Sequence, residues 1–156
     1  MDIEIINTPI RFQLHGISSS VAGERYAEVG MGLMNQLWQQ VKASNTATTG
    51  INHWVYLPQG RMFVGVEPLP CSAVPESLTP LEFELLRYLR HLHIGPYQTL
   101  PDKWQDLMAE LTRLGETLCA PSLEIYEHQC EDDDSEPETE ILLGLKPISS
   151  AVGRVS

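Results

Sequence analysis

The chain has 156 residues, of which 42% are hydrophobic and 20% charged, and its 10 basic and 21 acidic side chains give a formal net charge of -11. The length predicts one compact domain with its own hydrophobic core, and the hydrophobic content excludes an intrinsically disordered chain. The acidic balance argues against a nucleic-acid binder, which needs a basic surface, and against binding to an anionic membrane.

Neither the cysteines nor the N-terminus indicates a secreted or membrane protein. Cys71, Cys119 and Cys130 are odd in number and far apart, so they predict neither a disulfide framework nor a zinc site. The N-terminus carries Asp2 and Glu4 and lacks the apolar stretch of a signal peptide, and no run of about 18 apolar residues is present to span a membrane. We therefore expect a cytoplasmic protein with no membrane contact.

The first half of the chain predicts a strand, a helix and two further strands. Residues 10–17 alternate apolar and polar side chains, as a half-buried strand does. One helix face follows at the expected spacing, formed by Met34, Leu37, Trp38 and Val41. Residues 51–57 are rich in β-branched and aromatic types, and after a turn at 58–60 residues 61–67 predict the next strand.

The second half predicts the same order of elements. Residues 86–94 indicate a strand, and a helix is expected to begin near Leu100 and to end near 115–118. The apolar face of this helix comprises Trp104, Leu107, Met108, Leu111 and Leu114. Residues 122–128 and 138–145 predict the last two strands.

The two halves also resemble each other in sequence. Gly65 and Pro68 of the first half recur as Gly144 and Pro147 of the second, in similar apolar surroundings. Such a repeat indicates a duplicated structural unit. We therefore predict an α+β fold of two βαββ repeats with pseudo-two-fold symmetry, in which antiparallel sheets are flanked by two main helices.

This organisation sets the expected domain boundaries. Residues 1–149 would form a single domain, with repeat one at about 8–70 and repeat two at about 80–149. The Pro- and Ser-rich segment 69–80 predicts a surface crossover between the repeats, and residues 150–156 predict a flexible tail.

A series of motifs in the second half resembles a known family. The series comprises His93-Ile94-Gly95-Pro96-Tyr97, a helix with Trp104, Pro121-Ser122-Leu123-Glu124-Ile125-Tyr126, and Glu138-Thr139-Glu140-Ile141 with Pro147. In this order and spacing the chain resembles the GyrI-like small-molecule-binding family, the effector-binding domain found behind DNA-binding modules in AraC-type and MerR-type regulators. The resemblance is specific across about 90–149 and vaguer across 1–70. It implies a SOUL-like duplicated βαββ fold and a cleft between the halves for hydrophobic, often cationic or aromatic compounds.

Two features depart from the regulator members of the family. The repeat begins by about residue 10, which leaves no room for a helix-turn-helix, so we expect no direct DNA binding by this chain. The acidic segment 131–136 is an insertion to which the family resemblance assigns no role. Seven of the 21 acidic residues lie within 131–140, which predicts a solvated loop that keeps the protein soluble.

Glu124 is the first candidate for chemistry. Strand alternation places Glu124 and Tyr126 on one face and Leu123 and Ile125 on the other. If Leu123 and Ile125 face the helices, Glu124 faces the cleft, where a buried carboxylate would recognise a cationic ligand or act as a general base. The strand pattern alone favours a solvated carboxylate on an open sheet face, and the family resemblance reverses that preference.

Aromatic side chains are the second group of candidates, since Tyr126 would stack on a ligand or donate its hydroxyl to it. Trp54 and Tyr56 share a face of the equivalent first-half strand, where they would form the opposite pocket wall or pack as core aromatics. Tyr97 would line the cleft mouth or close its turn, and Trp104 would anchor its helix. The candidate ligand-binding residues are Glu124, Tyr126, Trp54, Tyr56, Tyr97, Trp104 and His93.

Metal and haem sites are disfavoured. His91 and His93 share a strand face, but two imidazoles without a third ligand are weak support for a metal site. The broader fold group resembles haem-binding SOUL proteins, yet the sequence contains no Cys-x-x-Cys-His attachment motif. We expect no metal and no cofactor.

Three functions remain open. The favoured one is a standalone protein, not an enzyme, that binds hydrophobic cationic or aromatic small molecules. The alternative is a hydrolase of electrophilic compounds, in which Glu124 activates water and Tyr126 polarises the leaving oxygen. The third is a gyrase-inhibitor-like interaction module, whose acidic surface would bind a regulator or a gyrase-like enzyme. A monomer and a dimer are both compatible with the sequence.

Overall fold

The computed structural model describes residues 2–21, 26–127 and 137–147. Its elements are β1 (Glu4–Ile6), β2 (Ile10–Ser20), α1 (Tyr26–Ala43), β3 (Ile51–Leu57), β4 (Arg61–Val66), β5 (Thr79–Leu85), β6 (Tyr88–Ile94), the short 3₁₀ turn η1 (Tyr97–Thr99), α2 (Leu100–Leu114), β7 (Leu118–Glu127) and β8 (Glu138–Leu145). The acidic segment 131–136, the expected tail at 150–156, and Cys130 lie outside the described residues. Neither helix among these elements is long and apolar enough to cross a membrane.

The predicted duplication is confirmed. The order β2-α1-β3-β4 recurs as β6-α2-β7-β8, and the sheet order β1-β6-β8-β7-β3-β4-β2-β5 places the two units symmetrically about the β3–β7 pair. All the pairings are antiparallel. The antiparallel strands form one eight-stranded sheet, in which the β3–β7 pair joins the two units and leaves neither strand with an unpaired edge.

Two strands were not predicted from the sequence, and both connect the units. β1 precedes the first unit but pairs with β6 of the second, whereas β5 precedes the second unit and pairs with β2 of the first. The Pro80-containing start of β5 lies at the end of the segment assigned to the crossover. Proline is tolerated there because β5 is an edge strand.

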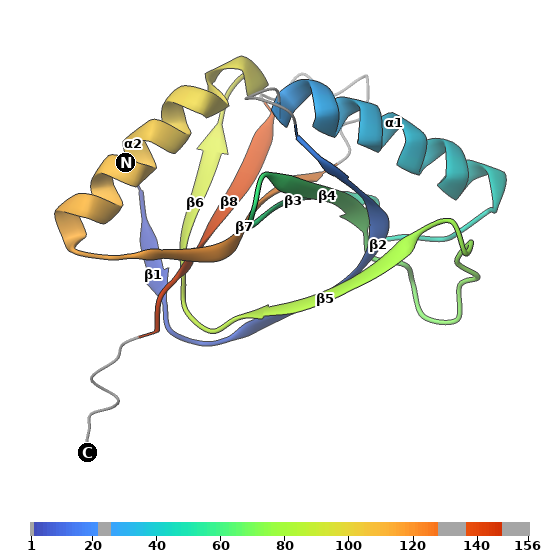
Figure 1. Cartoon of the computed structure of the whole chain (residues 1–156), viewed down its shortest axis with the longest axis horizontal. Helices are drawn as coiled ribbons and strands as arrows, with labels where there is room; N and C mark the ends of the chain where they lie inside the picture. The colour runs from blue at the N-terminus through green and yellow to red at the C-terminus, as the bar shows by residue number, and fades with distance from the viewer. Residues whose placement is uncertain (1, 22–25, 128–136, 148–156) are drawn as a thin grey trace.

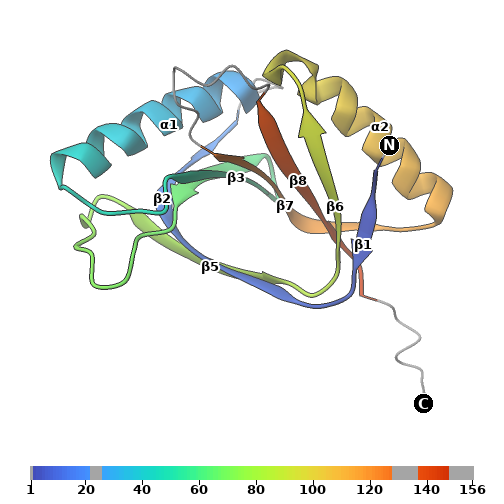
Figure 2. The same ribbon diagram turned by 180° about the vertical axis from the view of Figure 1, so that it is seen from behind.

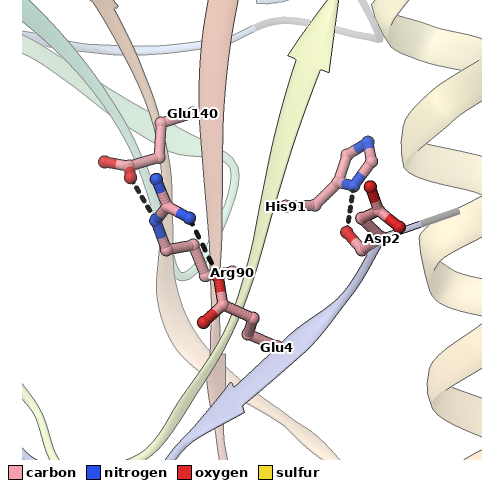
Figure 3. A network of polar contacts seen from close by, with 5 residues as sticks. All are labelled: Asp2, Glu4, Arg90, His91 and Glu140. Atoms are coloured by element: carbon pink, nitrogen blue, oxygen red, sulfur yellow. Dashed lines mark hydrogen bonds and ion pairs between the residues drawn. The ribbon is translucent and has the colours of Figure 1, made fainter.

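The short strand β1 is attached to the sheet by side chains as well as by its ladder. Arg90 of β6 donates to Glu4 of β1 at 3.0 Å and also to Glu140 of β8 (Figure 3). The imidazole Nδ1 of His91 lies 2.7 Å from the carbonyl oxygen of Asp2. The three strands β1, β6 and β8 are therefore joined across their register by polar contacts.

Both helices lie on the same side of the sheet, α1 over one unit and α2 over the other (Figures 1 and 2). Leu33, Leu37 and Val41 of α1 are buried against Met62 and Val64 of the sheet. The equivalent contacts of α2 are made by Leu107 and Leu111. Leu114, which we assigned to this buried face, is instead 43% exposed, because α2 ends there and Gly115 adopts a left-handed conformation (φ 72°).

The opposite side of the sheet holds a separate core without helices. Here the curvature of the sheet packs Phe12 and Leu85 of the outer strands against Val55, Leu123 and Leu142 of the inner ones. The condition that Leu123 faces the helices, under which Glu124 was placed in the cleft, does not hold: Leu123 lies in this core, and Glu124 faces the helices. Strand alternation separates the two faces correctly, but both faces are buried in this fold, so the pattern does not show which one meets the helices.

Candidate functional site

A pocket of about 680 Å³ opens on the helix side of the sheet, above the central strands β3 and β7. The N-terminal ends of α1 and α2 converge over these strands (Figure 1). The helices therefore contribute residues of their first turns, such as Tyr26 of α1 and Leu100 and Pro101 of α2. The exposed wall of the pocket is mostly apolar.

The floor of the pocket comes from the pair of strands that joins the two units. Alternation directs Trp54 and Tyr56 of β3 and Glu124 and Tyr126 of β7 to the same side. Trp54 lies directly opposite Glu124 in the antiparallel register. The duplication thus places one strand of each unit side by side beneath the ligand space.

Glu124 is the polar centre of this floor. Its residue surface is only 4% exposed, and its carboxylate accepts three hydrogen bonds. Tyr56 donates to Oε1 at 2.9 Å, Tyr126 donates to the same oxygen, and the indole nitrogen of Trp104 donates to Oε2. Both oxygens act as acceptors, as in an ionised carboxylate.

The two tyrosine donors are held in their protonated form. Burial, followed by the neighbouring charge of Glu124, raises the pKa of Tyr56 well above the usual value of 10.0 for the phenol. Burial and Glu124 raise the pKa of Tyr126 in the same direction. Neither hydroxyl ionises near neutral pH, so both remain available as donors to the carboxylate.

The negative charge of Glu124 has no cationic partner in the part of the chain that the structure describes. Its three partners there are neutral donors, and the described lining residues include no lysine, arginine or histidine. Hydrogen bonds of this kind stabilise a buried carboxylate without cancelling its charge. The floor of the pocket is therefore a site of negative potential.

Aromatic rings surround this carboxylate and hold one another in place. Four ring pairs meet edge to face, with centroids 5.3 to 5.4 Å apart: Tyr26–Tyr56, Trp54–Tyr126, Tyr56–Trp104 and Tyr97–Tyr126. Such pairs stabilise each other beyond simple burial. The walls are therefore preorganised before any ligand enters.

Six of the seven residues that the sequence suggested for ligand binding line this pocket: Trp54, Tyr56, Tyr97, Trp104, Glu124 and Tyr126. Trp104 does more than anchor its helix, since it also donates to Glu124. The seventh, His93, is buried on β6 and is not among the lining residues. Its Nε2 lies 2.8 Å from the hydroxyl of Thr99, so it attaches the η1 turn to the sheet.

The residues described by the structure contain no cluster of three or more His, Cys, Asp or Glu side chains that could hold a metal ion. Of the two histidines considered for such a site, His91 contacts the backbone of Asp2 and His93 contacts Thr99. The two rings thus make separate structural contacts.

Several lining residues were not identified from the sequence. Asn52 shares the face of Trp54 and Tyr56, so strand alternation alone would have found it. Tyr26 and Met31 come from the first turns of α1. No sequence pattern places them at this pocket, because their position depends on how the helix crosses the sheet.

Residues 59–146 match the family model of the GyrI-like small molecule binding domain. This match covers more than half of the chain, and the chain therefore belongs to the GyrI-like family. No curated protein matches the chain in sequence.

Solved structures extend the similarity to the whole fold. The C-terminal domain of EcmrR is 15% identical, with 95% of this chain and 100% of that chain covered and a TM-score of 0.69. SAV2435 bound to tetraphenylphosphonium is also 15% identical, with 96% of each chain covered and a TM-score of 0.66. A hydrolase from Listeria innocua is 12% identical, with 92% of this chain and 91% of that chain covered and a TM-score of 0.55. At these identities the similarity shows a shared fold.

Proposed function

We propose that this protein binds hydrophobic cations that carry aromatic groups, with Glu124 providing the charge contact. The observation that supports this most directly is a buried carboxylate at the floor of an aromatic pocket, with neutral hydrogen-bond donors and no cationic partner among the described residues. A ligand cation would supply the missing positive charge. Burying such a cation is favourable only where a compensating charge is already present.

The aromatic walls suit the same class of ligand. Faces of Trp and Tyr rings attract cations, and their apolar area favours aromatic groups of the ligand. The volume of about 680 Å³ accommodates a drug-sized molecule. The structure of SAV2435, which has the same fold, contains tetraphenylphosphonium, an aromatic cation of this kind.

Hydrolysis of electrophilic small molecules is the second candidate, supported by the fold similarity to the Listeria innocua hydrolase. In that reaction Glu124 would take a proton from water. However, Oε1 already accepts two hydroxyl groups and Oε2 accepts an indole N–H. Three of the roughly four acceptor positions of the carboxylate are therefore already occupied, which favours binding over catalysis.

The hypothesis of a gyrase-inhibitor-like interaction module depends on the acidic segment 131–136, which lies outside the described residues. The geometry of the pocket does not bear on this hypothesis. A cytoplasmic location remains a prediction from the sequence.

Isothermal titration calorimetry with two ions of equal shape tests the proposal. Tetraphenylphosphonium is a cation and tetraphenylborate is an anion with the same four phenyl groups, so their difference in affinity isolates the charge contact. We expect the protein to bind the cation and to reject the anion. In Glu124→Gln the affinity for the cation should fall by at least about tenfold, which corresponds to about 1.4 kcal/mol.

Glu84→Gln is the matched control, because it removes the same charge from an exposed position on the edge strand β5. Its affinity for the cation should equal that of the unmodified protein. Equal binding of cation and anion, or an unchanged affinity in Glu124→Gln, would contradict the role of Glu124. Mass spectrometry of an electrophilic ester after incubation separates binding from turnover, since the hydrolase alternative requires a product that Glu124→Gln does not form.

A further inference from the structure

Asn52 is a second polar group of the pocket, and its contacts give it a defined orientation. It lies on β3, is 6% exposed, and lines the pocket on the same face as Trp54 and Tyr56. Its position in the register is opposite Tyr126 of β7. A buried amide at such a place needs partners for both its oxygen and its nitrogen.

The oxygen of this amide accepts a hydrogen bond from a side chain of α1. The indole nitrogen of Trp38 lies 2.6 Å from Oδ1 of Asn52, and Trp38 is not among the lining residues of the pocket. An indole N–H can only donate, so its partner must be the amide oxygen. This contact removes the usual ambiguity between the oxygen and the nitrogen of an asparagine.

The nitrogen of the same amide has no acceptor in the part of the chain that the structure describes. The bond from Trp38 is the one hydrogen bond of the Asn52 side chain there. Among the described residues, five side-chain polar atoms are both buried from solvent and without a partner, and the Asn52 nitrogen is not one of them. The NH₂ group is therefore accessible, and since Asn52 lines the pocket, the pocket is where an acceptor can reach it.

The donor on Asn52 and the charge of Glu124 lie at separate points of the floor. Trp54, two residues after Asn52, is the register partner of Glu124. Asn52 and Glu124 are thus diagonal neighbours on one sheet face, for which a separation of about 7–8 Å is typical. A ligand that contacts both groups needs an acceptor that lies roughly one aromatic ring away from its positive charge.

We infer that Asn52 determines specificity within the class of aromatic cations, by donating from its amide nitrogen to a carbonyl, ether or ring-nitrogen acceptor of the ligand. This inference rests on the proposed function, in which Glu124 binds the cationic centre. The two contacts make the pocket a two-point site. The aromatic walls then provide affinity, and the pair Glu124 and Asn52 provides selection and orientation.

Two phosphonium ions test this inference by calorimetry on the full chain. Tetraphenylphosphonium has no acceptor, whereas (4-acetylphenyl)triphenylphosphonium adds one carbonyl oxygen at the far end of a ring. We expect the unmodified protein to bind the acetyl compound about fivefold to tenfold more tightly, as one added hydrogen bond in a buried site allows.

Asn52→Leu should remove this preference, so that the ratio of the two affinities falls to about one, since it removes the donor while keeping a side chain of similar size. Because Asn52→Leu also removes the acceptor of Trp38, Asn52→Asp is the second variant. It keeps an oxygen for Trp38 and replaces the donor by an acceptor. The added charge raises the affinity for both cations, so the ratio between them is the readout, and it should fall to one or below.

Glu124→Gln distinguishes the two proposals, because it should weaken both cations by the same factor and leave their ratio unchanged. Equal binding of the two cations by the unmodified protein, or a preference that persists in both Asn52 variants, would overturn the role of Asn52 and leave that of Glu124 intact. Failure of both cations to bind would overturn the proposed function together with this inference.

Discussion

The two faces of the central strands β3 and β7 differ in polarity, although their residues alternate along the same strands. On the helix side, Glu124 is surrounded by donors and opens to a pocket. On the other side, Val55 and Leu123 are completely buried in an apolar core. His53, which lies among them, has an Nδ1 atom without a partner, and burial lowers its pKa from 6.5 to about 4. A carboxylate is stabilised where neighbouring side chains supply donors, whereas a protonated imidazole is disfavoured where burial removes it from water.

This difference predicts that stability and binding can be changed separately at neighbouring positions of β7. Leu123→Ala removes a fully buried side chain and should lower the free energy of unfolding by about 2–5 kcal/mol. Chemical denaturation measures this loss. Calorimetry at a temperature where the variant is folded should show an unchanged affinity for tetraphenylphosphonium.

Glu124→Gln provides the reverse case, because its main effect falls on ligand affinity. A tenfold loss of affinity in folded Leu123→Ala would show that the two faces are coupled, and the separation drawn between core and pocket would be wrong.

The second prediction concerns the pH dependence of the core side. The unfolded chain protonates His53 below about pH 6.5, whereas the folded chain resists protonation down to about pH 4. The unfolded state therefore binds more protons in this window. The contribution of His53 to stability is full above pH 6.5 and falls by about 3 kcal/mol as the pH drops to 4.

Denaturation between pH 7 and pH 4 measures this effect by comparison with His53→Gln, which has no titrating ring. Carboxylates contribute equally to both proteins, so the difference in slope belongs to His53. Parallel pH profiles for the two proteins would show that the ring takes up its proton without cost in the folded state.

The third prediction uses two glycines of α1, only one of which touches the pocket wall. A Cβ on Gly30 would lie 2.4 Å from the Trp54 ring, whereas a Cβ on Gly32 would meet nothing within 4 Å. Gly30→Ala should displace Trp54, destabilise the protein by about 1–3 kcal/mol and weaken binding of the cation. Gly32→Ala should stabilise it by about 0.5–1 kcal/mol through helix propensity, with binding unchanged.

Thermal denaturation and tryptophan fluorescence compare the two variants. A stabilised Gly30→Ala with unchanged fluorescence would contradict the tight contact between α1 and Trp54.

Local patterns determined much of this protein. Strand alternation predicted that Glu124 and Tyr126 share a face and that Trp54 and Tyr56 do so on the equivalent strand. Helical spacing predicted the buried positions Leu37 and Leu107 of the two helices. These periodicities follow from the geometry of single elements, so they are present in the sequence before any tertiary contact forms.

Only the tertiary structure decided which face of β7 meets the helices. Strand alternation left this choice open because the curved sheet buries both of its faces, and in the structure Glu124 faces the helices while Leu123 lies in the opposite core. The pairing of β1 with β6 and of β5 with β2 depends on contacts between distant parts of the chain. The same is true of Tyr26 above the pocket and of Trp38 behind Asn52, since the crossing of α1 over the sheet sets both contacts.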